Sequence, residues 1–243
     1  MAQLAMRSTN LSPALVLFDI DGTLVRRAGP QHREALEYAT WRVLRAKTSM
    51  DGIPVHGMLD TDIVTAMLRR VGVRVKEARA AMPELTSVAE GRYLRRGPGP
   101  LEKRICPGAR YLLTRLQRRE VPMLLVTGNF PKIGWRKLEL AGLADYFLDG
   151  AFAGASSTRS GLARIAIRKA RANGWLNGAA VSDANVALIG DSPNDILAAR
   201  ENKIRSVAVS TGINTHEELA SHAPHVLVRR LSELRLAHLV GDG

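Results

Sequence analysis

Residues 14–25 decide the fold of this chain, and they read ALVLFDIDGTLV. The first five residues form a continuous apolar run, which is typical of a strand buried on both faces of a parallel sheet. The run ends at Asp19, and a polar turn, DIDGT, follows it. We therefore expect two carboxylates, those of Asp19 and Asp21, at the carboxyl end of a buried strand.

Strands and helices alternate in the rest of the chain from residue 107 onward. We expect buried strands at residues 121–126, 186–190, 205–209 and 225–228, and helices at residues 107–119, 131–141, 160–173, 193–201, 215–221 and 231–239. This alternation predicts an α/β fold built on a doubly wound, Rossmann-like parallel sheet.

Residues 27–104 show only helical and loop patterns, with helices expected at residues 31–45, 60–71 and 75–96. The second helix should be capped by Asp60 or Thr61, and the third should break near Pro83 and Gly91. Gly97-Pro98-Gly99-Pro100 is the strongest linker signal. We expect an α/β core of residues 1–26 and 105–243, interrupted by an all-helical domain of residues 27–104, with hinges near Arg26–Gly29 and Gly97–Pro107.

Polar clusters follow three of the expected strands. They are Asp19 to Thr23, Thr127-Gly128-Asn129, and Asp191 to Asp195, which reads DSPND. Taken alone, each cluster is an ordinary turn or helix cap. Because the carboxyl ends of parallel strands meet at one edge, the three together predict a site with four carboxylates and several hydroxyl groups.

Four carboxylates at one edge repel one another and raise one another's pKa values. A divalent cation removes this repulsion, and all-oxygen ligands favour a hard cation such as Mg²⁺. Phosphoryl transfer needs a nucleophile, charge neutralisation and a proton donor, all of which these groups can supply. The sequence therefore predicts a Mg²⁺-dependent enzyme of phosphoryl transfer.

These residues resemble the haloacid dehalogenase-like superfamily. FDIDGTLV (18–25) matches its first motif, VTGN (126–129) its second and GDSPND (190–195) its fourth. The resemblance covers about residues 14–240, and the helical insertion resembles the cap of phosphoglycolate phosphatases and β-phosphoglucomutases. It implies a cap that closes over the sheet edge, excludes water and selects the leaving group.

The resemblance also implies roles for individual residues. Asp19 looks like the nucleophile that forms an aspartyl-phosphate, and Asp21 like the general acid and base. Thr127, with the backbone N–H groups of Gly128 and Asn129, would bind the phosphoryl group. The metal ligands implied are Asp19, Asp21 through its backbone carbonyl, Asp191 and, directly or in a second layer, Asp195. The presence of Asp21 favours phosphoryl over carbon chemistry.

The third motif departs from the family pattern, which has a lysine, often followed by proline, before the fourth motif. Arg159 is the best match by position, and its guanidinium could neutralise the nucleophile and phosphate in a bidentate way. Arg164 and Lys169 are weaker substitutes. The alternative is that Arg159 is an ordinary solvent-exposed residue at the start of a helix.

Substrate contacts from the insertion are expected in the loop PVHGMLD (54–60), through His56, Gly57 and Met58. Arg26 and Arg27 are placed to contact an anion. The alternatives are that His56 is an ordinary surface histidine and that Arg26 and Arg27 belong to a solvent-exposed hinge.

The function we expect is a phosphatase (a phosphoric monoester hydrolase) acting on a small anionic phosphorylated metabolite, such as phosphoglycolate or a sugar phosphate. One alternative is a phosphomutase of the β-phosphoglucomutase type. Another is a non-enzymatic basic binding protein with a vestigial site, against which the intact carboxylates argue.

The composition of the chain limits the other classes of function and the expected location. The formal net charge is +12, from 35 Lys and Arg against 23 Asp and Glu, but aromatic residues are only 5%, so we do not expect nucleic-acid binding. No apolar stretch is long enough for a membrane span, the N-terminus lacks a signal-like apolar region, and one cysteine needs no oxidising compartment. We expect a cytoplasmic monomer or homodimer.

Overall fold

One parallel sheet organises the computed structural model, which describes residues 13–26 and 29–240. The described strands are β1 (Leu15–Phe18), β2 (Met123–Val126), β3 (Asp149–Ala151), β4 (Val186–Gly190), β5 (Arg205–Val209) and β6 (Val226–Val228). Their order in the sheet is β3-β2-β1-β4-β5-β6. All neighbouring strands are parallel, and β1 lies between β2 and β4. The predicted α/β fold with a doubly wound parallel sheet is confirmed.

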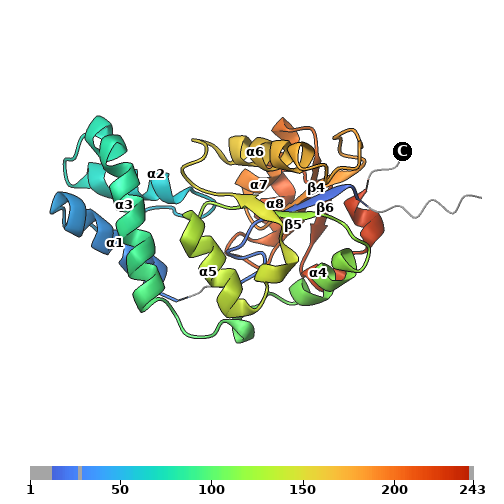
Figure 1. Cartoon of the computed structure of the whole chain (residues 1–243), viewed down its shortest axis with the longest axis horizontal. Helices are drawn as coiled ribbons and strands as arrows, with labels where there is room; N and C mark the ends of the chain where they lie inside the picture. Colours follow the sequence, from blue (N-terminus) through green and yellow to red (C-terminus); the bar gives the residue numbers. More distant parts are fainter. Residues whose placement is uncertain (1–12, 27–28, 241–243) are drawn as a thin grey trace, which may run out of the picture.

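Helices cover both faces of this sheet (Figure 1). They are α4 (Ala109–Gln117), α5 (Pro131–Ala141), α6 (Arg159–Ala172), α7 (Pro193–Glu201) and α8 (His216–Ser221). Successive side chains of a strand point to opposite faces. Leu15 and Leu17 accordingly belong to the core shared with α6 and α7, whereas Val16 and Phe18 belong to the core shared with α4. Burial on both faces explains why β1 is apolar throughout.

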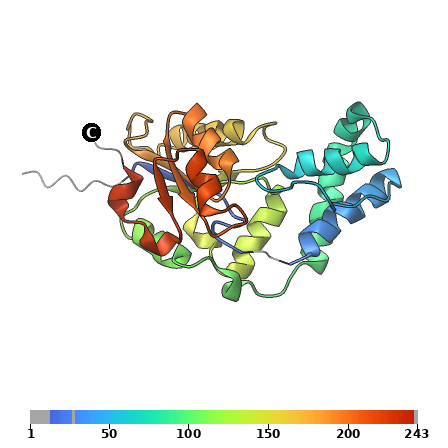
Figure 2. The same ribbon diagram turned by 180° about the vertical axis from the view of Figure 1, so that it is seen from behind.

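Three helices are inserted between β1 and α4: α1 (Gln31–Leu44), α2 (Asp60–Arg70) and α3 (Val75–Arg96). They lie together at one end of the molecule, with α1 packed against α3, as Figures 1 and 2 both show. We call α1, α2, α3 and the loops that join them the helical insertion.

Two chain segments join the helical insertion to the sheet, and they run side by side. Val25 and Ile105 form an antiparallel bridge, and the Cys106 N–H donates a hydrogen bond of 2.9 Å to the carbonyl of Leu24. The expected boundary at residue 27, the contact expected from Arg27 and part of the hinge expected at Arg26–Gly29 lie outside the described residues.

Two helix predictions are wrong. The third helix of the insertion is not broken, because Pro83 and Arg79, whose carbonyl Pro83 cannot bond, both lie on the exposed face, where water can solvate the carbonyl. Residues 231–239 form two 3₁₀ turns, Leu231–Glu233 and Leu236–Leu239, with extended backbone at Leu234. The buried leucines there are spaced by 3, 2 and 3 residues, which does not fit one α-helical stripe.

Two further differences concern β3 and the start of α2. β3 is a three-residue strand, DGA, that carries little apolar signal and forms by pairing with β2. Asp60 is the first residue of α2, not its cap, and makes no capping hydrogen bond at that helix. Its carboxylate is used elsewhere, as described below. Among the described residues, no helix combines the length and the apolarity needed to cross a membrane.

Candidate active site

A cavity of about 790 Å³ lies between the sheet edge and the helical insertion. From β1 the chain builds β2 and β3 on one side and then returns to build β4, β5 and β6 on the other. Ligands of such sheets bind in the crevice where the strand order reverses in this way. Residues from the ends of β1, β2 and β4 line the cavity on one side. Residues of α1, of α2 and of the loop before α2 line it on the other. The cavity is the candidate active site.

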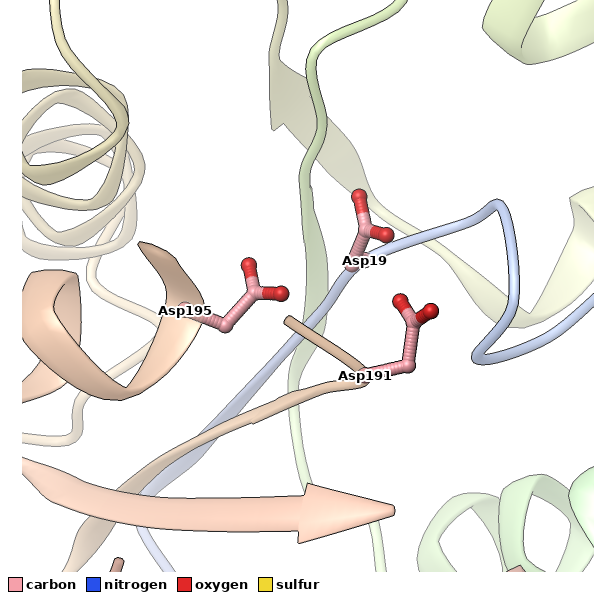
Figure 3. Close-up of side chains that lie close together, drawn as sticks. All are labelled: Asp19, Asp191 and Asp195. Carbon is pink, nitrogen blue, oxygen red and sulfur yellow. The ribbon is translucent and has the colours of Figure 1, made fainter. Parts of the chain in front are cut away.

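Three carboxylates gather at this end of the sheet, those of Asp19, Asp191 and Asp195 (Figure 3), and the first two line the cavity. One oxygen from each lies within 4.8 Å of the others. Asp19 follows β1, Asp191 follows β4, and Asp195 is in the first turn of α7. There the Oδ2 atom of Asp195 accepts hydrogen bonds from the backbone N–H and the hydroxyl of Ser192, at 3.2 and 2.6 Å. The capping box of α7 therefore fixes the third carboxylate.

Two glycines make room for the Asp191 carboxylate. A Cβ atom at Gly22 or at Gly212 would overlap it. Gly22 also has a φ of +84°, a left-handed conformation that side chains other than glycine rarely adopt. The glycine of the first motif is thus required both by its backbone conformation and by the neighbouring carboxylate.

Arg159 lies against this acidic cluster. It is the first residue of α6, and its side chain is only 7% exposed. One terminal nitrogen is 3.1 Å from Asp19 Oδ1 and also donates to the carbonyl of Val126, and Nε is 3.0 Å from Asp195 Oδ1. The structure thus brings together the predicted Arg159 and the predicted nucleophile. Of the two weaker candidates, Arg164 is exposed and Lys169 pairs with Asp149.

Burial and repulsion raise the proton affinity of two members of the cluster, Asp19 and Asp191. Desolvation is the largest cause of the raised pKa of Asp19, about 7. Asp195 and Asp21 raise it further, and Arg159 lowers it. Desolvation, followed by the charges of Asp19 and Asp195, raises the pKa of Asp191 well above its usual value. Desolvation would lower the pKa of Arg159, but the charges of Asp19 and Asp195 raise it above its usual value, so the guanidinium stays charged.

The acidic cluster fits a hard divalent cation. All three groups are carboxylates, the ligand type that Mg²⁺ prefers. The Asp195 Oδ1 atom is buried and accepts no hydrogen bond among the described residues, although Arg159 Nε is near, so it has capacity for a further partner. Asp19, Asp191 and Asp195 would hold the ion.

Asp21 faces the cavity but is directed to different partners. Its carboxylate accepts hydrogen bonds from Lys137 Nζ at 2.6 and 2.8 Å and from Asn129 Nδ2 at 2.8 Å. Desolvation would raise the pKa of Asp21, but the charge of Lys137 and these hydrogen bonds together lower it below its usual value. The side chain of Asp21 therefore stands apart from the three-carboxylate cluster, as an ionised group.

The second-motif residues lie beside it, at the end of β2. Thr127 Oγ1 accepts hydrogen bonds from the backbone N–H and the side-chain amide of Asn129, at 3.3 and 2.7 Å. The carbonyl of Met58 approaches Gly128 so closely that a Cβ atom there would clash. Gly128 therefore lets the helical insertion reach the sheet edge.

The loop before α2, from which substrate contacts are expected, lines the cavity. Val55, His56, Gly57 and Met58 all line it. Asn194 Nδ2, next to the acidic cluster, donates a 2.9 Å hydrogen bond to the carbonyl of Gly57. Arg26 also lines the cavity, from an exposed position.

Sequence reasoning missed three residues: Lys137, His32 and Asp60. The signal for Lys137 was present, because it lies between Ile133 and Ala141 on the buried face of α5. A lysine in the middle of an apolar stripe demands a partner. For His32 and Asp60 we find no comparable signal, since both look like ordinary residues of a first helical turn.

Replacing Asp191 by Asn tests the electrostatics of the cluster. An aspartate whose folded-state pKa is raised costs stability that grows as pH rises from the unfolded value, near 4, to the folded value. We expect Asp191→Asn, in EDTA at pH 8, to unfold about 2–4 °C higher than wild type, which corresponds to about 1 kcal/mol. The difference should shrink as pH falls toward 4. Differential scanning calorimetry measures it.

The matched control for this prediction is Asp145→Asn, which neutralises an exposed carboxylate. It should leave the melting temperature unchanged within about 1 °C. A lower melting temperature for Asp191→Asn in EDTA would contradict the repulsion.

The sequence profile of the haloacid dehalogenase-like hydrolases matches residues 13–202. This match covers more than half of the chain, and the chain belongs to that family. A curated relative, the phosphoglycolate phosphatase of Photobacterium profundum, is 23% identical over 221 residues, covering 90% of this chain and 93% of the relative.

Solved structures share the fold. The β-phosphoglucomutase of Clostridium difficile superposes with a TM-score of 0.66 at 19% identity, over 92% of this chain and 93% of that one. CbbY of Rhodobacter sphaeroides, solved with phosphate, gives a TM-score of 0.68 at 19% identity, over 93% and 99% of the two chains.

Proposed function

We propose that this hydrolase is a Mg²⁺-dependent phosphatase of small phosphorylated metabolites that works through an aspartyl-phosphate on Asp19. One observation carries the proposal. A buried cluster of three carboxylates, bridged by a buried arginine, opens into a cavity at the switch point of a doubly wound sheet. The family to which the chain belongs supports the reaction class.

In the first half of the proposed reaction, an oxygen of Asp19 attacks the phosphorus atom, and the bond to the leaving oxygen breaks. Arg159, held against Asp19, offers N–H donors and positive charge to the phosphoryl oxygens. Thr127 and the N–H groups of Gly128 and Asn129 lie at the neighbouring strand end to bind the same oxygens. Asp21 donates a proton to the leaving oxygen.

In the second half, Asp21 accepts a proton from water, which attacks the phosphorus atom and releases Asp19. The lowered pKa of Asp21 suits this half, since the group is then ionised. A phosphate dianion bound beside Asp21 favours its protonated form and so prepares it for the first half. Bound Mg²⁺ would neutralise negative charge on the carboxylates and the phosphoryl group.

We further propose that residues 27–104 form a cap domain that closes the site. The cavity wall formed by His56 and Met58, and the hydrogen bond from Asn194 to Gly57, show where the helical insertion meets the sheet edge. A wall of this kind excludes water and selects the leaving group. Phosphoglycolate is the first candidate substrate, because a curated relative carries that activity in its name.

Phosphate release from a panel of phosphorylated metabolites tests the function. We expect release with Mg²⁺ and at least about 100-fold less with EDTA, because without the ion the repulsion between the carboxylates and the phosphoryl group is not neutralised. Phosphoglycolate and sugar phosphates head the panel. A colorimetric assay for inorganic phosphate provides the measurement.

Other outcomes identify the alternatives. A phosphomutase would convert a sugar phosphate to its isomer, with a bisphosphate activator, faster than it released phosphate. Absence of both reactions, with salt-sensitive retention of a polyanion by folded protein, would favour a basic binding protein with a vestigial site.

A further inference from the structure

We propose that Lys137 is a positioning residue that holds the carboxylate of Asp21 in place and ties it to the helical insertion through His32. The inference rests on the proposed function, in which Asp21 handles the protons of the reaction. Its evidence is a set of four side chains linked by hydrogen bonds, two from the core and two from the insertion.

Lys137 is unusual in its burial. Its side chain is 2% exposed, and it is the only lysine that is buried among residues 13–26 and 29–240. Taking an ammonium group out of water is costly, and apolar side chains of similar volume often replace buried ion pairs without loss of stability. Stability alone therefore does not account for this lysine.

The three N–H bonds of the Lys137 ammonium match three acceptor groups. They are the Asp21 carboxylate at 2.6 and 2.8 Å, Asn129 Oδ1 at 2.6 Å and His32 Nδ1 at 3.2 Å. Asn129 in turn donates to Asp21 and to Thr127. The side chain of Asp21 remains 42% exposed toward the cavity while Lys137 and Asn129 hold it from behind. This arrangement fixes the direction in which Asp21 points.

His32 extends the contact into the helical insertion. Because Lys137 is a donor only, His32 Nδ1 must accept, and Nε2 then carries the proton that it donates to Asp60 Oδ2 at 3.0 Å. The ring also packs edge-on against Tyr93 of α3, with centroids 6.0 Å apart. Helices α1 and α3 therefore set the place of His32.

Asp60 connects this set of side chains back to the core. Its Oδ2 atom accepts a 2.7 Å hydrogen bond from the N–H of Phe130, and its own N–H donates to the carbonyl of Gly128 at 2.7 Å. Asp60 is 2% exposed. With the insertion seated, the set Asp60–His32–Lys137–Asp21 is complete, so the position of the proton donor depends on the seating of the insertion.

The consequence for catalysis depends on the leaving group. An alkyl phosphate needs a proton on its leaving oxygen, whereas the nitrophenolate of p-nitrophenyl phosphate leaves without one. Misplacement of a reacting group by about 1 Å costs up to about 100-fold in rate. In the first half of the reaction, loss of Lys137 should therefore slow alkyl phosphates selectively.

The test compares Lys137→Met with wild type on both substrate types, with Mg²⁺ present. We expect kcat/KM for the best alkyl phosphate of the panel to fall about 10- to 100-fold, and kcat/KM for p-nitrophenyl phosphate to fall less than about 3-fold. This ratio reports only the first half of the reaction, whereas kcat also includes the second half, in which Asp21 acts on both substrate types alike. In an Asp21→Asn background the Lys137→Met change should cost nothing further. Lys132→Met, an exposed lysine on the same helix, is the control and should behave as wild type.

His32→Gln provides a second variant, which keeps the pair between Lys137 and Asp21 but removes the ring that links it to Asp60. It should show the same selectivity with a smaller loss, about 3- to 10-fold, and it carries the test if Lys137→Met does not fold. Equal losses on both substrate types, losses that add to those of Asp21→Asn, or no loss at all would overturn the positioning role alone. Absence of phosphate release by wild type would overturn the proposed function and this inference together.

Discussion

Asp19→Asn is expected to lower phosphate release from the best substrate by about 10³-fold or more, to the limit of detection. The amide keeps the shape of the side chain but is a poor nucleophile, so the covalent step is lost. The folded structure should persist, because the substitution removes a charge from a cluster whose members repel one another. Initial rates of phosphate release, with circular dichroism to verify folding, provide the measurement.

Two features sharpen this experiment. Asp145→Asn changes an exposed carboxylate in the same way and should retain the wild-type rate. Asp19→Asn should still bind a phosphorylated substrate, because Arg159 and Thr127 remain in place. A variant that keeps more than about a tenth of the wild-type rate would show that Asp19 is not the nucleophile.

Arg159→Met should lower kcat/KM by about 100-fold, with the larger share in kcat. Arg159 is placed to bind the phosphoryl oxygens as their charge develops, and methionine offers no donor. The change also leaves Asp19 and Asp195 without their buried cation, so we expect a loss of stability of about 3–5 kcal/mol. Steady-state kinetics and urea unfolding measure the two effects separately.

Arg159→Lys separates charge from geometry. A lysine keeps the positive charge but cannot contact Asp19 and Asp195 through two sides of one planar group. We expect it to fold and to lose about 10-fold in kcat/KM. Arg164→Met, an exposed arginine on the same helix, is the control and should retain full activity. Full activity in Arg159→Met, with Arg164→Met impaired, would reassign the third motif.

The parallel sheet and the acidic site could be predicted because each has a local signal. The apolar runs that become β1, β2 and β4 end in polar residues, and parallel topology brings those ends together. The position of Arg159 could be predicted only from the family pattern. Its contacts with Asp19 and Asp195 depend on how α6 packs against the sheet, which no short stretch of sequence determines.

The group around Lys137 could not be predicted, because it joins segments far apart in the chain. His32 and Asp60 come from α1 and α2, and Lys137 from α5, so their meeting depends on how the insertion sits on the core. The position of Lys137 on an apolar stripe of α5 indicates a buried charge, but it does not indicate which residues pair with that charge. Two other elements could not be predicted for the same reason. β3 forms by pairing with β2, and the structure of residues 231–239 depends on an irregular pattern of leucine burial.

Asp19 is expected to carry the phosphoryl group during turnover. The direct measurement is mass spectrometry of acid-quenched enzyme mixed with Mg²⁺ and its best substrate, with Asp21→Asn used to slow release of the intermediate. We predict one added phosphoryl group, located on the peptide that contains Asp19 and absent from Asp19→Asn. Turnover with no phosphorylated enzyme in either wild type or Asp21→Asn, or a phosphoryl group on another residue, would contradict a covalent intermediate on Asp19.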